Sequence, residues 1–174
     1  MDPDSKPVHE AEDPALADLF QPSHVIPELV STSREEVIGE IVERVAAMGL
    51  VTDAKWLETA LTERERMVPT AMPNGVAFLH ARHRAAEKFP RQFLFVARST
   101  KGVPFGSPDE RPTHLFFLLA LRRDMAHLRW LARLSWICRN RNSVGSLLKA
   151  SKGEELSRAL RLAVEELPGN LRHR

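Results

Sequence analysis

The sequence has a single cysteine, no tyrosine and no long apolar run, and these scarcities remove whole classes of protein. Cys138 alone cannot build an internal disulfide framework or a zinc site made of cysteine pairs. No stretch approaches the roughly 18 consecutive apolar residues that a membrane-spanning helix needs. The N-terminus lacks the basic and apolar regions of a secretory signal. The 174 residues, 43% of them hydrophobic, therefore predict one globular domain in the cytoplasm, with no direct insertion into a membrane.

Several sequence motifs of catalysis are absent as well. The chain has no Walker phosphate loop, no GxGxxG after a strand, no GxSxG turn and no HExxH pair. Two-carboxylate chemistry has no obvious location in the sequence. We therefore expect no cofactor, and the chemistry has to come from other side chains.

Charge is distributed unevenly along the chain. Residues 1–40 contain ten acidic and two basic side chains, whereas residues 111–174 contain thirteen basic and five acidic ones. Such asymmetry can indicate a nucleic-acid partner, but no run of five clustered basic residues accompanies it. We instead expect solvated helix faces, an attraction between the acidic and basic ends, and no nucleic-acid partner.

Helical patterns surround a set of buried strands. Residues 1–14 hold three prolines and five acidic residues without apolar periodicity, which predicts a mobile acidic leader before a domain over 15–174. A capping box at Ser33 and Glu36 begins a helix that ends near Gly49. A second helix is expected over 53–65, with its apolar side chains inward: Trp56, Leu57, Ala60 and Leu61.

Short apolar runs at 75–79, 92–98 and 114–120 are typical of strands buried on both faces. A loop is expected over 102–108, with a short extended turn at 103–105. Three helices should follow: one capped by Asp124, one over 143–150, and one that a capping box at 151–154 begins and Pro168 ends. The inward face expected for the first of these is Leu128, Leu131, Leu134 and Ile137. The order of elements predicts a three-layer α/β sandwich with helices on both faces of the sheet.

His80 is the residue that stands out chemically, because it follows the 75–79 strand directly. Ligands of open α/β sheets usually bind beyond the carboxyl ends of strands. A neutral imidazole is a good nucleophile and can carry a phosphoryl group transiently. Arg64 offers a planar fork of donors that fits phosphate oxygens, although an exposed charge is its commoner role.

Two further residues belong to this candidate site. Thr70 can supply a hydroxyl donor to a phosphate, or it can cap a turn. His127 lies in the first turn of its helix, where free N–H groups favour anions and a neutral imidazole. It can hydrogen-bond to His80 or to a phosphate, or pack where helix and sheet meet.

Metal and nucleic-acid sites are weaker alternatives. His80, His83 and His127 could ligate zinc, but no carboxylate or thiolate has matching spacing, so we expect no metal. Cys138 is expected to be a small core residue. Trp130 and Trp136 lie in an apolar helical run, where core packing is the default explanation.

In combination, these residues resemble a known signature. Arg64-Glu65, Thr70, Gly75-Val76-Ala77 and His80-Ala81-Arg82 are similar to the motif of the type-2 enzyme IIA domains of the bacterial sugar phosphotransferase system. This is the fructose, mannitol and nitrogen-regulatory group, whose strand motif is roughly GIAIPHA. The resemblance covers about residues 15–167 and includes the helix from His127 to Leu134.

The resemblance implies a mixed sheet between helices and a phosphohistidine at His80. It also implies a phosphoryl donor, the phosphocarrier HPr or a homologue, and either a IIB acceptor or a regulatory use. Arg64 and His127 would line the phosphate site. The chain departs from the motif at Leu79, where the family has proline, and this change could loosen the strand exit. A non-catalytic regulatory protein of the same fold is therefore the alternative. No second domain is visible, which is typical of nitrogen-regulatory members, although separate sugar-specific IIA proteins also exist.

Overall fold

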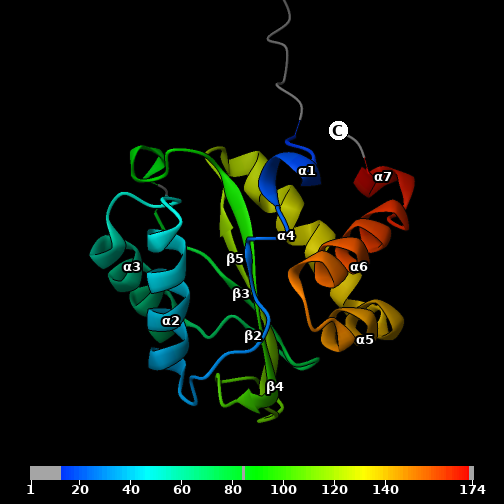
Figure 1. Cartoon of the computed structure of the whole chain (residues 1–174), viewed down its shortest axis with the longest axis horizontal. Coiled ribbons are helices and arrows are strands. Elements are labelled where there is room, and N and C mark those ends of the chain that lie inside the picture. The colour runs from blue at the N-terminus through cyan, green and yellow to red at the C-terminus, as the bar shows by residue number, and fades with distance from the viewer. Residues whose placement is uncertain (1–12, 84, 173–174) are drawn as a thin grey trace, which may run out of the picture.

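The computed structural model describes residues 13–83 and 85–172, which form a five-stranded mixed sheet between layers of helices (Figure 1). The strand order is β1-β4-β5-β3-β2. β1 runs parallel to β4 and β3 runs parallel to β5, while the β4–β5 and β2–β3 pairs are antiparallel. The strands are β1 (Val25–Ile26), β2 (Ala71–Met72), β3 (Val76–Leu79), β4 (Phe93–Val103) and β5 (Thr113–Ala120).

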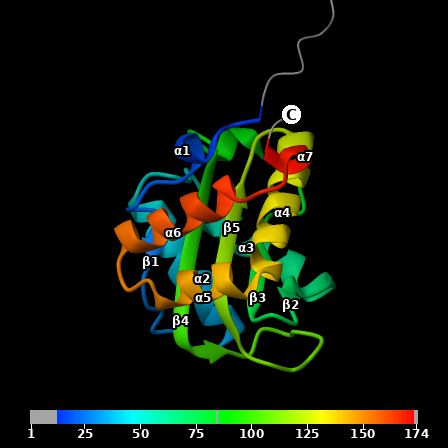
Figure 2. The same ribbon diagram turned by 90° about the vertical axis from the view of Figure 1, so that its right-hand side faces the viewer.

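Helices cover both faces of the sheet, so the predicted three-layer sandwich is confirmed (Figures 1 and 2). One face carries α2 (Arg34–Ala47) and α3 (Ala54–Met67). The other carries α4 (Asp124–Arg139), α5 (Arg141–Lys149) and α6 (Gly153–Glu165). Successive residues of the inner strands alternate between two cores, because side chains of a strand point to opposite faces. Phe116 packs with α2 and α3, whereas Phe117 packs with α4 and α6.

The first two long helices begin where local capping signals place them. Ser33 accepts the N–H of Glu36 at 3.3 Å, and the Glu36 carboxylate accepts the N–H of Ser33 at 3.1 Å. Gly49 has φ of 68°, the left-handed conformation that ends many helices. Asp53 caps α3 by accepting the N–H of Trp56 at 2.9 Å. Helix α3 runs two residues beyond the predicted end at residue 65, so Arg64 lies in its last turn.

The later helices correct several details of the sequence prediction. Helix α4 has Arg123 at its N-cap, and Asp124 is its first residue rather than its cap. Leu128 was expected to face inward but is 58% exposed, because α4 is rotated to bury the neighbouring His127. Helix α5 begins at Arg141 rather than at residue 143, with Asn140 as its cap.

Helix α6 starts one residue later than its predicted capping box. Lys152 occupies the N-cap, and Glu155 rather than Glu154 accepts from the N–H and hydroxyl of Ser151. Gly153 lies so close to the preceding chain that a Cβ there would meet the carbonyl oxygen of Pro22 at 2.0 Å. This close approach explains why glycine occupies the first helical position.

Short elements were missed because they have too few residues to show a period. These are α1 (Leu16–Leu19), β1, β2, the 3₁₀ turn η1 (Ala86–Lys88) and α7 (Gly169–Arg172), which follows the predicted stop at Pro168. Strand β4 continues to Val103, past the predicted loop start at residue 102, through an irregularity in its pairing with β5. Trp56 and Ala60 are only partly buried, whereas Leu57 and Leu61 are buried as expected.

The predicted leader over 1–14 lies mostly outside the described residues. Its last two positions belong to the folded part. Asp13 forms ion pairs with Arg129 at 3.2 Å and Arg133 at 2.9 Å, and the Pro14 carbonyl accepts from the Trp130 indole at 3.1 Å. These pairs are one instance of the expected attraction between acidic and basic ends. None of the helices in the described ranges is long and apolar enough to cross a membrane.

Candidate functional site

The two histidines meet because β3 and β5 end at the same edge of the sheet. The strands are parallel, with Leu79 opposite Leu118. His80 follows β3 directly, and α4 begins shortly after β5. This places the ring of His127, in the first turn of α4, beside the ring of His80, with centroids 5.1 Å apart and planes tilted by 57°.

Arg64 reaches the same imidazole from α3. Helices α3 and α4 lie on opposite sides of the sheet (Figure 1). Nε of Arg64 donates to Nε2 of His80 at 3.2 Å, and its Nη1 donates to the carbonyl of Val68 at 2.7 Å. His80 therefore lies at the sheet edge between an arginine from α3 and a histidine from α4. The structure brings together three of the four predicted site residues.

The hydrogen bonds around His80 determine its tautomer. Nδ1 lies 2.8 Å from the carbonyl oxygen of Phe78, which can only accept, so Nδ1 carries a proton. The guanidinium of Arg64 can only donate, so Nε2 presents its lone pair. The ring is thus the neutral form with Nε2 as its nucleophilic atom. Nε2 thus lies beside the Arg64 guanidinium, whose positive charge can stabilise a bound phosphoryl group.

The fourth predicted residue, Thr70, is placed in a turn below the site. Its backbone N–H donates to the Glu65 carboxylate at 2.9 Å, and its hydroxyl donates to the same carboxylate. Both donors of Thr70 thus go to the Glu65 side chain, and the turn-capping role stays a prediction. Direct phosphate binding by Thr70 stays a prediction.

Glu65 is a residue of this region to which the sequence analysis gave no role. It is 2% exposed, and burial is the main cause that raises its pKa above the usual range for a glutamate. A signal for its burial exists in the sequence. Glu65 follows Leu57 and Leu61 at intervals of four, so it falls on the inward face of α3.

Leu79 keeps its place in the sheet despite replacing the family proline. It is fully buried in β3 and pairs with Leu118 in β5. The strand exit still directs His80 toward Arg64 and His127. The departure from the motif therefore does not turn the imidazole away from its partners.

Two further groups that the sequence analysis considered are His83 and Cys138. His83 is exposed and lines a cavity of about 180 Å³ with Arg64, Met67 and Arg82. Among the described residues, no group of three or more His, Cys, Asp or Glu side chains could hold a metal ion. Cys138 is buried in the core as predicted, and burial raises the pKa of its thiol to about 12.

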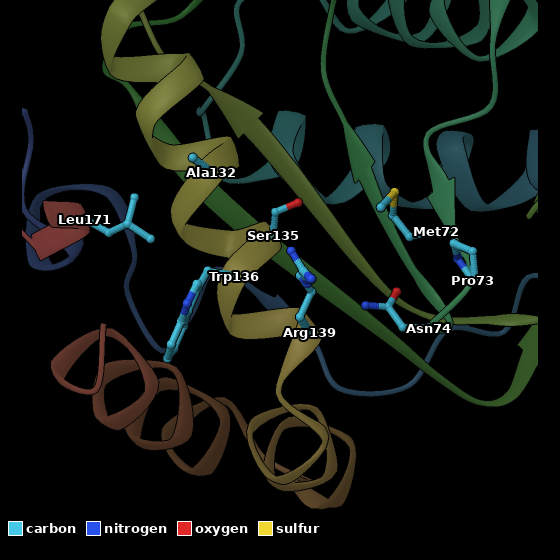
Figure 3. A pocket seen from close by; sticks show the side chains of 8 residues that line it. All are labelled: Met72, Pro73, Asn74, Ala132, Ser135, Trp136, Arg139 and Leu171. Carbon is cyan, nitrogen blue, oxygen red and sulfur yellow. The ribbon is translucent and has the colours of Figure 1, made fainter. Parts of the chain in front are cut away.

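A larger groove of about 610 Å³ opens at the other end of α4 (Figure 3). It is lined by residues of the β2–β3 turn, of the second half of α4 and of α7: Met72, Pro73, Asn74, Ala132, Ser135, Trp136, Arg139 and Leu171. Asn74 precedes β3 and His80 follows it, so β3 separates the groove from the imidazole pair. Trp130 is buried as predicted, whereas Trp136 is only partly buried beside this groove.

The site is thus a histidine nucleophile paired with an arginine at the edge of an α/β sandwich. Residues 18–162 match the family model "Phosphoenolpyruvate-dependent sugar phosphotransferase system, EIIA 2". The chain belongs to this family of type-2 enzyme IIA domains, which are phosphotransferase components. The predicted family is therefore confirmed.

Curated relatives come from both the regulatory and the sugar-specific branches. The chain is 29% identical over 139 residues to a nitrogen regulatory protein of Bradyrhizobium diazoefficiens, covering 79% of this chain and 88% of the relative. It is 30% identical over 128 residues to the fructose-specific EIIABC component of Bacillus subtilis. That match covers 72% of this chain and 20% of the relative.

Solved structures show the same fold. Nitrogen regulatory protein IIA-Ntr from Neisseria meningitidis superposes with a TM-score of 0.72 at 23% identity, covering 82% of this chain and 96% of that one. IIA mannitol from Escherichia coli gives a TM-score of 0.70 at 18% identity, covering 81% and 98%. Another solved structure is a complex of the Escherichia coli mannitol enzyme IIA with phosphorylated enzyme IIB, again with a TM-score of 0.70 at 18% identity. It covers 82% of this chain and 96% of that chain.

Proposed function

We propose that this protein carries a phosphoryl group on Nε2 of His80, receives it from an HPr-like phosphocarrier, and either passes it to a IIB-like partner or uses it as a signal. The observation that carries the proposal is the hydrogen bond from Arg64 Nε to His80 Nε2, made while Phe78 holds the proton on Nδ1. The relay acts in the cytoplasm under this proposal.

The transfer step follows from these contacts. The lone pair of Nε2 forms a bond to phosphorus while the bond between phosphorus and the donor nitrogen breaks, and that electron pair leaves on the donor. Nδ1 keeps its proton throughout and donates it in a hydrogen bond to the Phe78 carbonyl. Before the bond to phosphorus forms, Arg64 moves its Nε–H from the Nε2 lone pair to the phosphoryl oxygens, where its charge stabilises the transferring group.

The surface around the histidines supports a protein partner. Seven large hydrophobic side chains are exposed in the described residues. Four of them lie within four residues of Arg64 or His127 in the sequence: Met67, Val68, Met125 and Leu128. Exposed apolar side chains near a reactive group favour a protein partner. The names of the relatives favour a IIB-like acceptor in one branch and a regulatory target in the other.

Intact-mass measurement tests the proposal. Incubation with enzyme I, HPr and phosphoenolpyruvate from the same organism should add about 80 Da, the mass of one phosphoryl group, in an acid-labile and base-stable form. The gain should vanish in His80→Ala and persist in the matched control His83→Ala. Phosphoramidate, a small phosphoryl donor, should modify His80 without any carrier protein.

The two donors separate the parts of the proposal. Phosphorylation by phosphoramidate but not by HPr would support His80 as the nucleophile and contradict HPr as the donor. Modification that persists in His80→Ala, or maps to His83, would overturn the assignment. Transfer from the phosphorylated protein to a fructose-type IIB domain would favour the relay over the regulatory role.

A further inference from the structure

We propose that Glu65 and Thr70 act together as a positioning clamp that aims Arg64 at His80. This inference rests on the proposed function of His80 and adds to it the device that holds its arginine. Neither residue touches the imidazole in the structure. Their effect on it passes through the backbone between them.

The clamp closes a short loop at the end of α3. Both oxygens of the Glu65 carboxylate accept from Thr70, one from its N–H and one from its hydroxyl. Between these residues, Met67 and Val68 are 56% and 62% exposed, so their side chains bury little surface that would hold the loop. Pro69 lies close to Gly106, where an added Cβ would meet the proline ring at 2.9 Å. The clamp is thus one polar tie across this turn, and a second joins Arg64 to the Val68 carbonyl.

The loop that the clamp closes presents the Val68 carbonyl to Arg64. Nη1 of Arg64 donates to this carbonyl at 2.7 Å. Because a guanidinium is a rigid plane, holding Nη1 keeps all of its donors beside His80, within a short shift of a phosphoryl group. Nε then meets Nε2 of His80 at 3.2 Å. Glu65 thus holds Thr70, and the closed loop positions the Val68 carbonyl. That carbonyl holds Arg64, and Arg64 in turn contacts the nucleophile.

The clamp also keeps the charge of Arg64 available. Glu65 is its direct neighbour, but the Glu65 carboxylate turns inward to Thr70, and no ion pair joins the two residues in the described part of the chain. An ion pair on the surface would compete with a phosphoryl group for the same donors. Nη2 of Arg64 makes no hydrogen bond within the described residues, so it can bind a phosphoryl oxygen.

The inference is tested by the rate at which phosphoramidate phosphorylates His80, because this small donor needs no docking surface. Thr70→Val removes the hydroxyl and keeps the shape, and we expect it to slow phosphorylation by about tenfold, since a misplaced donor loses part of the roughly 10²–10³-fold effect of a well-placed one. Thr70→Ser restores the hydroxyl and should stay within about twofold of wild type. Thr59→Val, at an exposed site on α3, makes the same substitution away from the clamp and should leave the rate unchanged.

Combining the variants distinguishes positioning from loss of fold. If the clamp acts through Arg64, Thr70→Val should have no further effect on the rate in an Arg64→Ala background. An equal slowing in both backgrounds would mean that Thr70 only supports the fold, and an unchanged rate in Thr70→Val alone would overturn the clamp.

A spectroscopic readout keeps the clamp testable whatever the activity. In ¹⁵N-labelled protein, the wild type should show His80 with a proton on Nδ1 and an Arg64 Nε–H signal shifted by its hydrogen bond. Thr70→Val should lose that shift, and Thr70→Ser should keep it. If neither donor phosphorylates the wild type, the proposed function fails, while the Arg64 signal still decides the clamp. An Arg64 signal that is the same in all three proteins would overturn it.

Discussion

Arg64 and His80 are sixteen residues apart in the sequence, and their side chains meet through a hydrogen bond of 3.2 Å between Nε and Nε2. The arginine belongs to the helical layer on one face of the sheet, and the strand that ends at His80 belongs to the sheet itself. Nδ1 of His80 carries a proton and donates it to the Phe78 carbonyl, so Nε2 of the neutral ring can only accept. The contact with Arg64 therefore defines both the nucleophilic atom and the cation beside it.

The first prediction concerns the guanidinium fork of Arg64. Arg64→Ala should lower the rate of His80 phosphorylation by about 10²–10³-fold, because it removes a preorganised donor. Arg64→Lys keeps the charge but cannot bind Val68 and His80 at once, so its rate should fall between those of wild type and the alanine variant. Single-turnover phosphorylation measures all three. Wild-type rates in both variants, with unchanged stability, would make Arg64 a surface charge only.

The second prediction concerns the close approach at the start of α6. Gly153→Ala should lower the free energy of unfolding by roughly 1–3 kcal/mol, because its Cβ would meet the Pro22 carbonyl oxygen at 2.0 Å and the backbone has to shift. Gly145→Ala, inside α5 with open space around its Cβ, should instead raise stability by about 0.5–1 kcal/mol. Urea unfolding of both variants is the measurement. An unchanged free energy of unfolding in Gly153→Ala would show that the segments at Gly153 and Pro22 move apart at little cost.

The third prediction concerns the pH dependence of stability at His24. This ring is 4% exposed, with Nδ1 at 3.2 Å from the carbonyls of Leu19 and Leu94. Burial lowers its pKa in the folded state, the two carbonyl hydrogen bonds raise it without cancelling that lowering, and nearby Arg91 adds a smaller lowering. The unfolded chain therefore binds a proton first as pH falls through about 6.5, which favours unfolding. The contribution of His24 is present above that pH and is lost below it.

The measurement is a difference between two proteins. From pH 7.5 to 5.5, the wild type should lose more unfolding free energy than His24→Asn, because the variant lacks this group while the other histidines remain. Parallel curves for the two proteins would show that His24 is protonated as easily in the folded chain as in the unfolded one.

The sequence predicted the parts of this structure that depend on local patterns. Apolar runs and turn residues predicted the three inner strands and the strand exit at His80, and a capping box predicted the start of α2. The two-residue strands β1 and β2 carry no period, so only pairing with β4 and β3 reveals them. The rotation of α4 that exposes Leu128 and buries His127 is decided by packing against the sheet. Helix periodicity alone did not distinguish these two neighbours.

The candidate site shows the same division. Arg64, His80 and His127 were chosen from residue chemistry and from a resemblance, and the structure brings them together. The role of Glu65 could not be predicted, because its partner Thr70 is defined by the path of the loop between them. The tautomer of His80 likewise depends on the Phe78 carbonyl, a backbone group whose position no side-chain pattern reports.

The last prediction concerns Leu79, where the family has proline. Proline at this position would remove the N–H of residue 79 and hold Phe78 in the extended conformation that it already has in β3. The Phe78 carbonyl that holds Nδ1 of His80 would remain in place. Since the strand exit already directs the ring to Arg64 and His127, Leu79→Pro should change the rate of His80 phosphorylation by less than about tenfold, or 1.4 kcal/mol in the barrier.

Leu79 is fully buried, so the rate of Leu79→Pro has to be read beside its stability. Leu79→Ala is the control for lost burial, because it removes three side-chain carbons, more than the one that proline removes, without fixing φ. Both variants should unfold at lower urea concentrations than wild type, and both should keep phosphorylation within the tenfold limit at temperatures where they are folded. A hundredfold gain in Leu79→Pro that is absent in Leu79→Ala would mean that leucine holds the wild-type site in a slow arrangement. That outcome would favour the regulatory, non-catalytic alternative, because the native chain would then bind its partners without an efficient relay.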